Sequence, residues 1–363
     1  MEKEFEPACR RMEWLDPFYK AVWEKAFAEG IPISGTFELT PRCNFNCKMC
    51  YVHLKEKDIP KYGKELSAKE WLRIAEEAKE AGTTWLCITG GEPLMHPEFP
   101  EIWKGLSEMG FFLTLQTNAS MITDEIQTLL EQYPPRQAKI TLYGSNDEVY
   151  EAVCGVKNGF TRVNDGIHTL MSMGIPVTLV STIIRQNAED AEKMAFYAYV
   201  HRLPWLSTNG VKDCLRHSGT DVKKVQVEDD QAERLRVAIE QRVCNQKFFD
   251  RNQKPCTWCR DYRVGYWILW NGRMSFCSFL DGPDITVWDQ SFRIAWKQLL
   301  ANEEALDWPE SCKNCEAFEV CAKCAATVQS LVVHENGKES EYCKAIQSEY
   351  RQQMDREKRK GEK

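Results

Sequence analysis

Short runs of apolar and β-branched residues recur along the first part of the chain, separated by longer amphipathic stretches. The runs are Ile33–Leu39, Thr84–Ile88, Phe112–Gln116, Lys139–Leu142, Val177–Ile184 and Trp205–Ser207. Runs of this length are typical of buried strands. A stretch such as Ser67–Glu80, which opens with a capping serine, is typical of a helix. The alternation predicts an α/β fold with a parallel sheet and crossover helices, either open and doubly wound or an incomplete barrel.

The flanking segments follow other patterns. The start of the chain has Trp14, Phe18, Val22 and Phe27 near helical spacing, and a charged stretch over Asp221–Arg242 predicts an exposed linker helix. After this stretch the chain becomes rich in Cys and Trp. We therefore predict a helical segment at 1–33, a sheet domain at 34–212, a linker helix at 213–248, a cysteine-rich domain at 249–347 and a charged tail at 348–363.

Composition and charge narrow the class of protein. The 363 residues are 43% hydrophobic and 28% charged, with a net charge of -7. These values are typical of a globular protein and indicate neither a nucleic-acid partner nor a membrane partner. The N-terminus shows no signal peptide or membrane span, so we expect a cytoplasmic protein. Because thiols stay reduced there, the sixteen cysteines predict metal binding or chemistry rather than disulfides.

The cysteines fall into groups. Cys9, Cys87, Cys154, Cys214 and Cys244 are scattered and are expected to be small buried hydrophobes. Three others lie near the start, at Cys43, Cys47 and Cys50. The remaining eight lie in the last third, at Cys256, Cys259, Cys277, Cys312, Cys315, Cys321, Cys324 and Cys343. A 4Fe–4S cluster takes four thiolates, so eight cysteines would saturate two clusters and three would leave one iron open.

The first group directly follows the first predicted strand, with spacing C-x3-C-x2-C and then Tyr51. A zinc site that lacks its fourth ligand and unrelated structural cysteines are the alternatives, although zinc usually uses paired CxxC knuckles. The motif and its position resemble the radical S-adenosylmethionine (radical SAM) superfamily. The resemblance implies a partial (β/α)6 barrel, a cluster whose open iron binds S-adenosylmethionine, and reductive cleavage to a 5'-deoxyadenosyl radical. It also implies a flavodoxin- or ferredoxin-type electron donor and an anaerobic or oxygen-protected setting.

Other strand ends carry residues where this family binds its cofactor. Gly90-Gly91-Glu92 ends the second strand, where the glycines would let backbone groups approach a ligand and Glu92 would pair with a cation. The resemblance implies S-adenosylmethionine contacts at Tyr51, Gly90, Gly91, Glu92, Thr117, Asn118, Thr141, Ser181 and Thr182. A structural role is the alternative for each polar strand-end residue.

The second cysteine group resembles the SPASM extension of radical enzymes that modify peptides, a small α+β domain with two auxiliary 4Fe–4S clusters. The resemblance implies one cluster on Cys256, Cys259, Cys277 and Cys324, and another on Cys312, Cys315, Cys321 and Cys343. The gap before Cys324 is two residues where the family has three, so this ligand departs from the pattern. A pair of zinc ribbons is the alternative.

The resemblance favours a maturase of ribosomally made peptides that forms a C–S or C–C crosslink or epimerises a residue. Ser278 stands where sulfatase-maturating relatives carry an aspartate base, which argues against that activity. The 42 residues before Cys43 leave no room for an N-terminal peptide-recognition domain, so a separate recognition protein or a small-molecule substrate is expected instead. Cys214 is a candidate hydrogen-atom donor in an epimerase, with an ordinary thiol as the alternative. A non-catalytic iron–sulfur or zinc scaffold is the alternative from another class.

Overall fold

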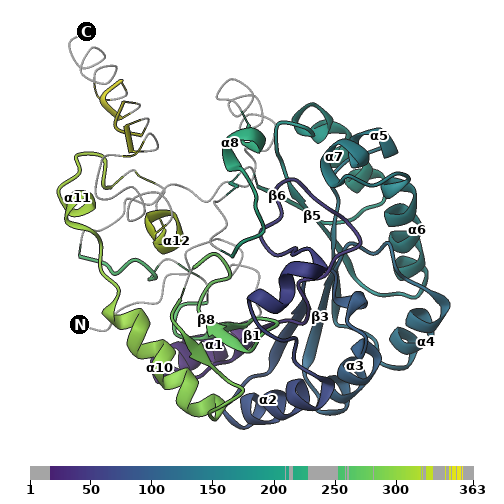
Figure 1. Cartoon of the computed structure of the whole chain (residues 1–363), viewed down its shortest axis with the longest axis horizontal. Coiled ribbons are helices and arrows are strands. Elements are labelled where there is room, and N and C mark those ends of the chain that lie inside the picture. Colours follow the sequence, from purple (N-terminus) through teal and green to yellow (C-terminus); the bar gives the residue numbers. More distant parts are fainter. Residues whose placement is uncertain are drawn as a thin grey trace.

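The computed structural model of the chain is shown in Figure 1. It describes residues 17–208, 210–211, 216–227, 252–257, 259, 261–280, 282–319, 321, 324–329, 340, 343–344, 346–348, 350–352 and 354. In this part of the chain a single sheet has the strand order β6-β5-β4-β3-β2-β1-β7-β8-β9. The sheet curves, and helices cover its outer side (Figure 1).

The six predicted strands are confirmed. They are β1 (Ser34–Glu38), β2 (Trp85–Thr89), β3 (Phe112–Thr117), β4 (Gln137–Thr141), β5 (Val177–Thr182) and β6 (Trp205–Thr208). Each pairs in parallel with the next one along the chain. This order requires a crossover between successive strands and produces the partial (β/α)6 barrel that the sequence predicts.

The crossover helices follow the predicted alternation. The N-terminal helix is α1 (Pro17–Glu29), and the crossovers contain α2 (Ala68–Glu80), α3 (Phe99–Glu108), α4 (Asp124–Gln132), α5 (Asp147–Cys154), α6 (Gly159–Ser172) and α7 (Ala191–Val200). Short 3-10 turns lie at η2 (Glu56–Lys61), η3 (Pro93–Met95) and η4 (Ala188–Asp190). Of the predicted linker helix the structure describes residues 216–227, of which only α8 (Val222–Val225) is helical. Residues 228–251 lie outside the described residues.

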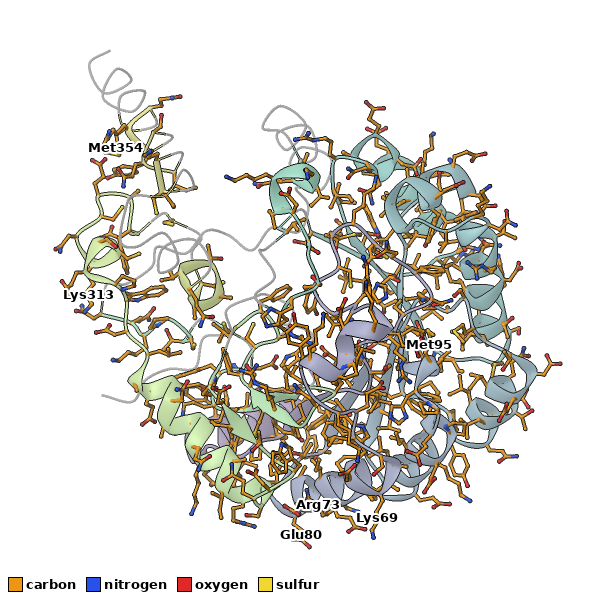
Figure 2. The ribbon with its side chains drawn as sticks, in the orientation of Figure 1. Lys69, Arg73, Glu80, Met95, Lys313 and Met354 are labelled. Carbon is orange, nitrogen blue, oxygen red and sulfur yellow. The ribbon has the colours of Figure 1, made fainter. Side chains whose placement is uncertain are left out.

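Helix α2 shows why these segments fold as predicted. The Ser67 hydroxyl accepts the Glu70 backbone N–H, and the Glu70 carboxylate accepts the Ser67 backbone N–H, so the predicted capping box is present. Its inner face buries Trp71 against the sheet. Figure 2 shows Lys69 and Glu80 projecting away from the sheet on the opposite face. The helix is therefore held by a cap and one apolar stripe.

The two faces of the sheet differ in chemistry. Alternate strand residues on the helix-covered face are apolar and at most 1% exposed, among them Leu86, Ile88, Leu115, Ile140 and Leu179. Their neighbours on the concave face are half-buried and mostly polar, among them Thr36, Cys87, Thr114, Gln116 and Lys139. A complete barrel fills its interior with branched apolar side chains. The polar concave face instead suits a ligand.

The C-terminal region extends the same sheet. Strand β7 (Gly265–Ile268) pairs in parallel with β1, and β8 (Arg273–Ser275) and β9 (Ile285–Thr286) follow in antiparallel pairs. Gly35 makes this pairing feasible, because a β-carbon there would overlap the ring of Tyr266. The sheet thus continues across the predicted boundary at residue 249, which the sequence pattern did not indicate.

Helices complete this region. The helix α10 (Phe292–Ala305) lies beside α2, and the Phe292 backbone N–H donates to the Glu77 carboxylate at 2.6 Å. Two short helices follow, α11 (Glu310–Lys313) and α12 (Ala325–Val328). None of the helices in the described ranges combines the length and the apolar composition needed to cross a membrane.

His96 joins the turn after β2 to the segment before α2. Its Nε2 lies 3.0 Å from the Leu66 carbonyl oxygen, and its Nδ1 accepts the Glu98 backbone N–H at 3.2 Å. For Nδ1 to accept, the ring must be neutral with its proton on Nε2. Burial lowers the pKa of His96 below its usual value of 6.5, which favours the same form.

We expect His96→Gln to lower stability by about 1 kcal/mol near neutral pH, the value of one net hydrogen bond. Because the folded pKa lies below the unfolded one, wild-type stability falls as the pH drops below 6.5. The variant lacks this term, so the difference in melting temperature should shrink between about pH 7.5 and about pH 5.5. Thermal unfolding of both proteins measures this difference. A difference that stays constant across the range would contradict the assignment.

Candidate active site

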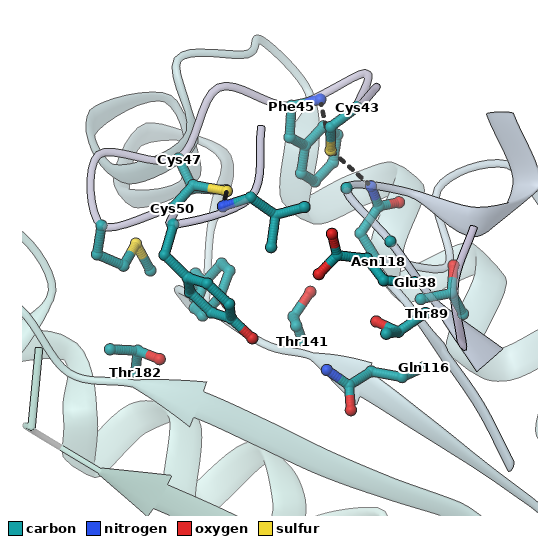
Figure 3. A pocket seen from close by; sticks show the side chains of 17 residues that line it. Glu38, Cys43, Phe45, Cys47, Cys50, Thr89, Gln116, Asn118, Thr141 and Thr182 are labelled. Carbon is teal, nitrogen blue, oxygen red and sulfur yellow. Dashed lines mark hydrogen bonds between the residues drawn. The ribbon is translucent and has the colours of Figure 1, made fainter. Parts of the chain in front are cut away.

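A cavity of about 130 Å³ lies at the carboxyl ends of the strands (Figure 3). Functional groups are expected at these ends in a parallel barrel. The lining residues come from β1, the loop that follows it, and the ends of β2 to β5. They are Glu38, Cys43, Phe45, Cys47, Met49, Cys50, Tyr51, Val52, Thr89, Gly90, Gly91, Gln116, Thr117, Asn118, Thr141, Tyr143 and Thr182.

The loop after β1, residues 40–52, brings Cys43, Cys47 and Cys50 to this cavity; we call it the cysteine loop. The Cys43 sulfur accepts the Phe45 N–H at 3.4 Å, and the Cys50 sulfur accepts the N–H groups of residues 52 and 53 at 3.4 and 3.2 Å. Such donors stabilise a thiolate. The Cys47 thiol also shares a hydrogen bond with the thiol of Cys154 on α5.

The charges around the cysteine loop favour a bound cation. Burial raises the pKa of Cys43 most strongly, and the negative charges of Glu92, Cys47 and Cys50 raise it further. A positive iron centre would relieve this repulsion, and soft thiolates are the ligands of iron–sulfur clusters. In the described part of the chain no three His, Cys, Asp or Glu side chains are already arranged as metal ligands. The three thiols have the right chemistry for an iron–sulfur cluster. Their side chains would have to rotate toward one another to bind it.

The Gly90–Gly91 turn after β2 packs against the backbone of the cysteine loop. The Gly91 N–H donates to the Thr40 carbonyl at 2.7 Å, and the Glu92 N–H donates to the Arg42 carbonyl at 2.8 Å. A β-carbon on Gly91 would overlap the Arg42 carbonyl, and one on Gly90 would lie 2.8 Å from the Thr40 oxygen. Both glycines also line the cavity, so the lack of a side chain allows this contact with the loop in addition to the predicted approach of a ligand.

Glu92 lies behind the cavity wall and is fully buried. Its carboxylate accepts hydrogen bonds from the Thr117 hydroxyl at 2.6 Å, the Asn118 N–H at 2.8 Å and the Leu94 N–H at 3.2 Å. Burial raises the pKa of Glu92 to about 7, and these hydrogen bonds oppose the rise. Among the described residues no cation pairs with Glu92, so the expected ion pair is replaced by neutral donors. The carboxylate joins the end of β2 to the end of β3.

Asn118 belongs to a ring of side-chain hydrogen bonds. Its amide N–H donates to the Asn44 carbonyl oxygen at 2.8 Å, the Asn44 amide donates to Ser120 at 2.8 Å, and the Ser120 hydroxyl returns to Asn118 at 2.7 Å. Figure 3 shows Asn118 pointing toward Cys43, with 4.0 Å between its nitrogen and the sulfur. The ring therefore holds the start of the cysteine loop against the end of β3.

The structure places most of the predicted cofactor contacts at the cavity. Those that line it are Tyr51, Gly90, Gly91, Thr117, Asn118, Thr141 and Thr182. Ser181 requires a correction: it is fully buried, donates to the Leu142 carbonyl at 2.5 Å and accepts the indole N–H of Trp205 at 2.8 Å. The next residue of β5, Thr182, lines the cavity, whereas Ser181 points to the helix-covered face of the sheet.

Sequence reasoning missed several lining residues. Glu38, Thr89, Gln116 and Tyr143 face the cavity but were not among the predicted contacts. The strand period of two could have identified two of them, since Gln116 lies two residues before Asn118 and Tyr143 two residues after Thr141.

Cys256 lies within electrostatic reach of three other cysteines of the second group, Cys259, Cys277 and Cys324. The pKa of Cys256 is raised by burial and then by the charges of Cys259, Glu303, Cys277 and Cys324. The Cys259 N–H donates to the Cys256 carbonyl at 2.9 Å, which closes the turn between these two. Glu303 on α10 is also buried, and this raises its pKa to about 8.

The other four cysteines belong to the last described segments. The Cys315 N–H donates to the Cys312 carbonyl at 3.1 Å, and Cys343 packs against the small apolar cluster that contains Cys312. The Cys321 N–H donates to the carbonyl of residue 317 at 3.0 Å. Cys214, the candidate hydrogen-atom donor, lies outside the described residues.

The part of the chain that forms the cavity is similar to a known protein family. Residues 37–198 match the radical SAM superfamily. The chain carries a radical SAM domain. The match spans β1 to α7 and so includes the cysteine loop and the strand ends that form the cavity.

Curated relatives match over a similar number of residues. A PqqA peptide cyclase of Ruegeria pomeroyi is 29% identical over 164 residues, which is 45% of this chain and 42% of the relative. An AdoMet-dependent heme synthase of Methanosarcina barkeri is 29% identical over 157 residues, 43% of this chain and 44% of the relative. The matched stretch thus spans less than half the length of these relatives.

Solved structures match over more of the chain. Streptococcus suis SuiB bound to S-adenosylmethionine has a TM-score of 0.64 at 15% identity, covering 92% of this chain and 84% of SuiB. The protein anSMEcpe with bound AdoMet and a peptide has a TM-score of 0.60 at 14% identity, covering 87% of this chain and 95% of anSMEcpe. At this identity the likeness shows a shared fold that includes the C-terminal region.

Gly91→Ala should destabilise the radical SAM domain by about 3 kcal/mol, because the added methyl overlaps backbone that cannot move without displacing the cysteine loop. Gly174→Ala is the matched control. Its φ of +74° disfavours a side chain, which is not the case for Gly91, but no atom lies within 4 Å of the added methyl, so about 1 kcal/mol is expected. Chemical unfolding of both variants measures the two losses. Equal losses would show that the turn accommodates a side chain.

Proposed function

We propose that the protein is a radical SAM enzyme that modifies a peptide substrate. The observation that carries this proposal is the placement of three cysteine thiols at a strand-end cavity inside a domain that matches the radical SAM superfamily. Cys43, Cys47 and Cys50 would hold the cluster. With S-adenosylmethionine bound, the cluster would supply a 5'-deoxyadenosyl radical for hydrogen-atom abstraction.

The other cavity residues would bind and orient the cofactor. Gln116, Thr141 and Thr182 stand on three successive strands, β3, β4 and β5. They present one amide and two hydroxyl groups to the cavity (Figure 3). These neutral donors and acceptors suit the ribose and the amino-acid end of S-adenosylmethionine. The ring of Tyr51 adds an apolar surface beside the thiols.

The C-terminal cysteines would hold two auxiliary 4Fe–4S clusters of the SPASM type. The charge interactions of Cys256 with Cys259, Cys277 and Cys324 support the first ligand set, including the irregular ligand Cys324. The packing of Cys343 against the Cys312 cluster supports the second set. Two fully ligated clusters would serve electron transfer, with a flavodoxin- or ferredoxin-type donor as the outer partner.

The peptide substrate is supported by two comparisons. One relative is named as a peptide cyclase, and the fold neighbour SuiB has been solved with a precursor peptide. A small molecule is the second candidate, because a heme synthase matches this chain at the same identity as the peptide cyclase. If the substrate is a peptide, a separate peptide-recognition protein would be a further partner. A small-molecule substrate would not require one.

Anaerobically purified protein should hold about twelve irons per chain, as three clusters require. With S-adenosylmethionine and a strong reductant it should release 5'-deoxyadenosine. Combined replacement of Cys43, Cys47 and Cys50 by alanine should leave about eight irons per chain, because only the first cluster is lost. This variant should release no 5'-deoxyadenosine. Iron analysis and chromatography of the products give both readouts.

Cys87→Ala is the control, because Cys87 on β2 does not line the cavity and belongs to neither cysteine group. It should change neither the iron content nor the release of 5'-deoxyadenosine. Colourless protein containing zinc would contradict the proposal and favour zinc ribbons. Intact clusters that release no 5'-deoxyadenosine would favour a non-catalytic scaffold.

A further inference from the structure

Glu38 places a carboxylate at the wall of the cavity. It is the last residue of β1, its side chain is fully buried, and it lines the cavity beside the cysteine loop. Both terminal nitrogens of Arg216, 178 residues away in sequence, donate to its two oxygens, one of them at 2.9 Å. The Arg216 side chain is only 10% exposed. In this buried bidentate pair, the guanidinium of Arg216 balances the negative charge of the Glu38 carboxylate.

The same guanidinium contacts two other segments. Its Nη1 also donates to the Ser278 carbonyl at 3.3 Å, and its carbon lies 5.8 Å from the centre of the Tyr51 ring. That ring packs on Phe279, with 4.4 Å between the ring centres. Arg216 therefore contacts the end of β1, the end of the cysteine loop and the residue directly after Cys277.

The segment that carries Arg216 is itself attached to the cysteine loop. The hydroxyls of Ser218 and Thr220 both donate to the Cys50 carbonyl, the first at 2.8 Å. The segment around Arg216 therefore connects two parts of the site through separate hydrogen bonds. One end is the backbone of the candidate ligand Cys50, and the other is the loop that presents the candidate ligand Cys277.

We propose that Arg216 is a positioning residue that holds the Cys277 loop, residues 277–279, against the cysteine loop at Tyr51. The planar fork of arginine donates to Glu38 through two nitrogens and still reaches the Ser278 carbonyl, whereas a lysine ammonium could not reproduce this arrangement. The inference rests on the proposed function only in treating Cys277 as a cluster ligand. The position of the Cys277 loop can be measured without any cluster.

A merely stabilising ion pair is the alternative, and paired replacement separates the two roles. Arg216→Met leaves Glu38 buried without its cation, which lowers both stability and loop order. The double variant Glu38→Met with Arg216→Met removes both charges, and apolar replacement of a buried pair is often neutral for stability. It does not restore the donor to Ser278 or the cation over Tyr51.

The test is the rate of alkylation of Cys277 by iodoacetamide in the full-length, reduced, cluster-free protein, read residue by residue by mass spectrometry. Arg216→Met should raise this rate about tenfold, the factor that corresponds to losing one hydrogen bond to a charged group. The rate at Cys312, which packs in a separate cluster with Trp308 and Phe318, should not change. In Arg216→Lys, the alkylation rate of Cys277 should be raised as it is in Arg216→Met.

The double variant gives the decisive comparison. Its melting temperature should return close to that of the wild type while Cys277 stays about tenfold faster. If stability and alkylation rate recover together, or if Arg216→Met leaves the rate at Cys277 unchanged, the positioning role is overturned. Iron content and 5'-deoxyadenosine release are measured separately, so failure of the proposed function would be seen independently.

Discussion

The site depends on one close approach between two backbones. The Gly90–Gly91 turn after β2 lies so near the start of the cysteine loop that a β-carbon would overlap the Arg42 carbonyl. Two backbone hydrogen bonds, from Gly91 to Thr40 and from Glu92 to Arg42, fasten the loop there. Because β1 and β2 are adjacent and parallel, this contact sets where the thiols stand relative to all the other strand ends.

Two buried carboxylates stabilise the site by different means. Glu92 is surrounded by neutral donors from β3, and its pKa rises to about 7 because burial outweighs these hydrogen bonds. Glu38 lies in a bidentate pair with Arg216. The first carboxylate joins neighbouring strands. The second joins the barrel to a segment far away in sequence, because the arginine fork carries enough donors to bind both carboxylate oxygens and a backbone carbonyl.

The C-terminal region is built on the barrel rather than beside it. Strand β7 pairs with the edge of β1, which would otherwise be an open sheet edge. The parallel register aligns the start of β7, Gly265, with the start of β1, Ser34. After β8, residues Ser278 and Phe279 lie next to Tyr51 of the cysteine loop. The Ser278 hydroxyl lies 3.5 Å from the Tyr51 hydroxyl, and 4.4 Å separates the ring centres of Tyr51 and Phe279.

The sequence by itself determined the strands, the helices and the cysteine groups. Local periodicity, capping residues and ligand spacing are properties of short segments, so the six strands and the Ser67 cap could be read directly. It could not place Glu38 or Arg216, nor exclude Ser181, because strand facing and long-range pairing depend on neighbours remote in the chain. Only the tertiary structure decided that Gly91 contacts the cysteine loop and that β7 extends the sheet, since both follow from packing between elements.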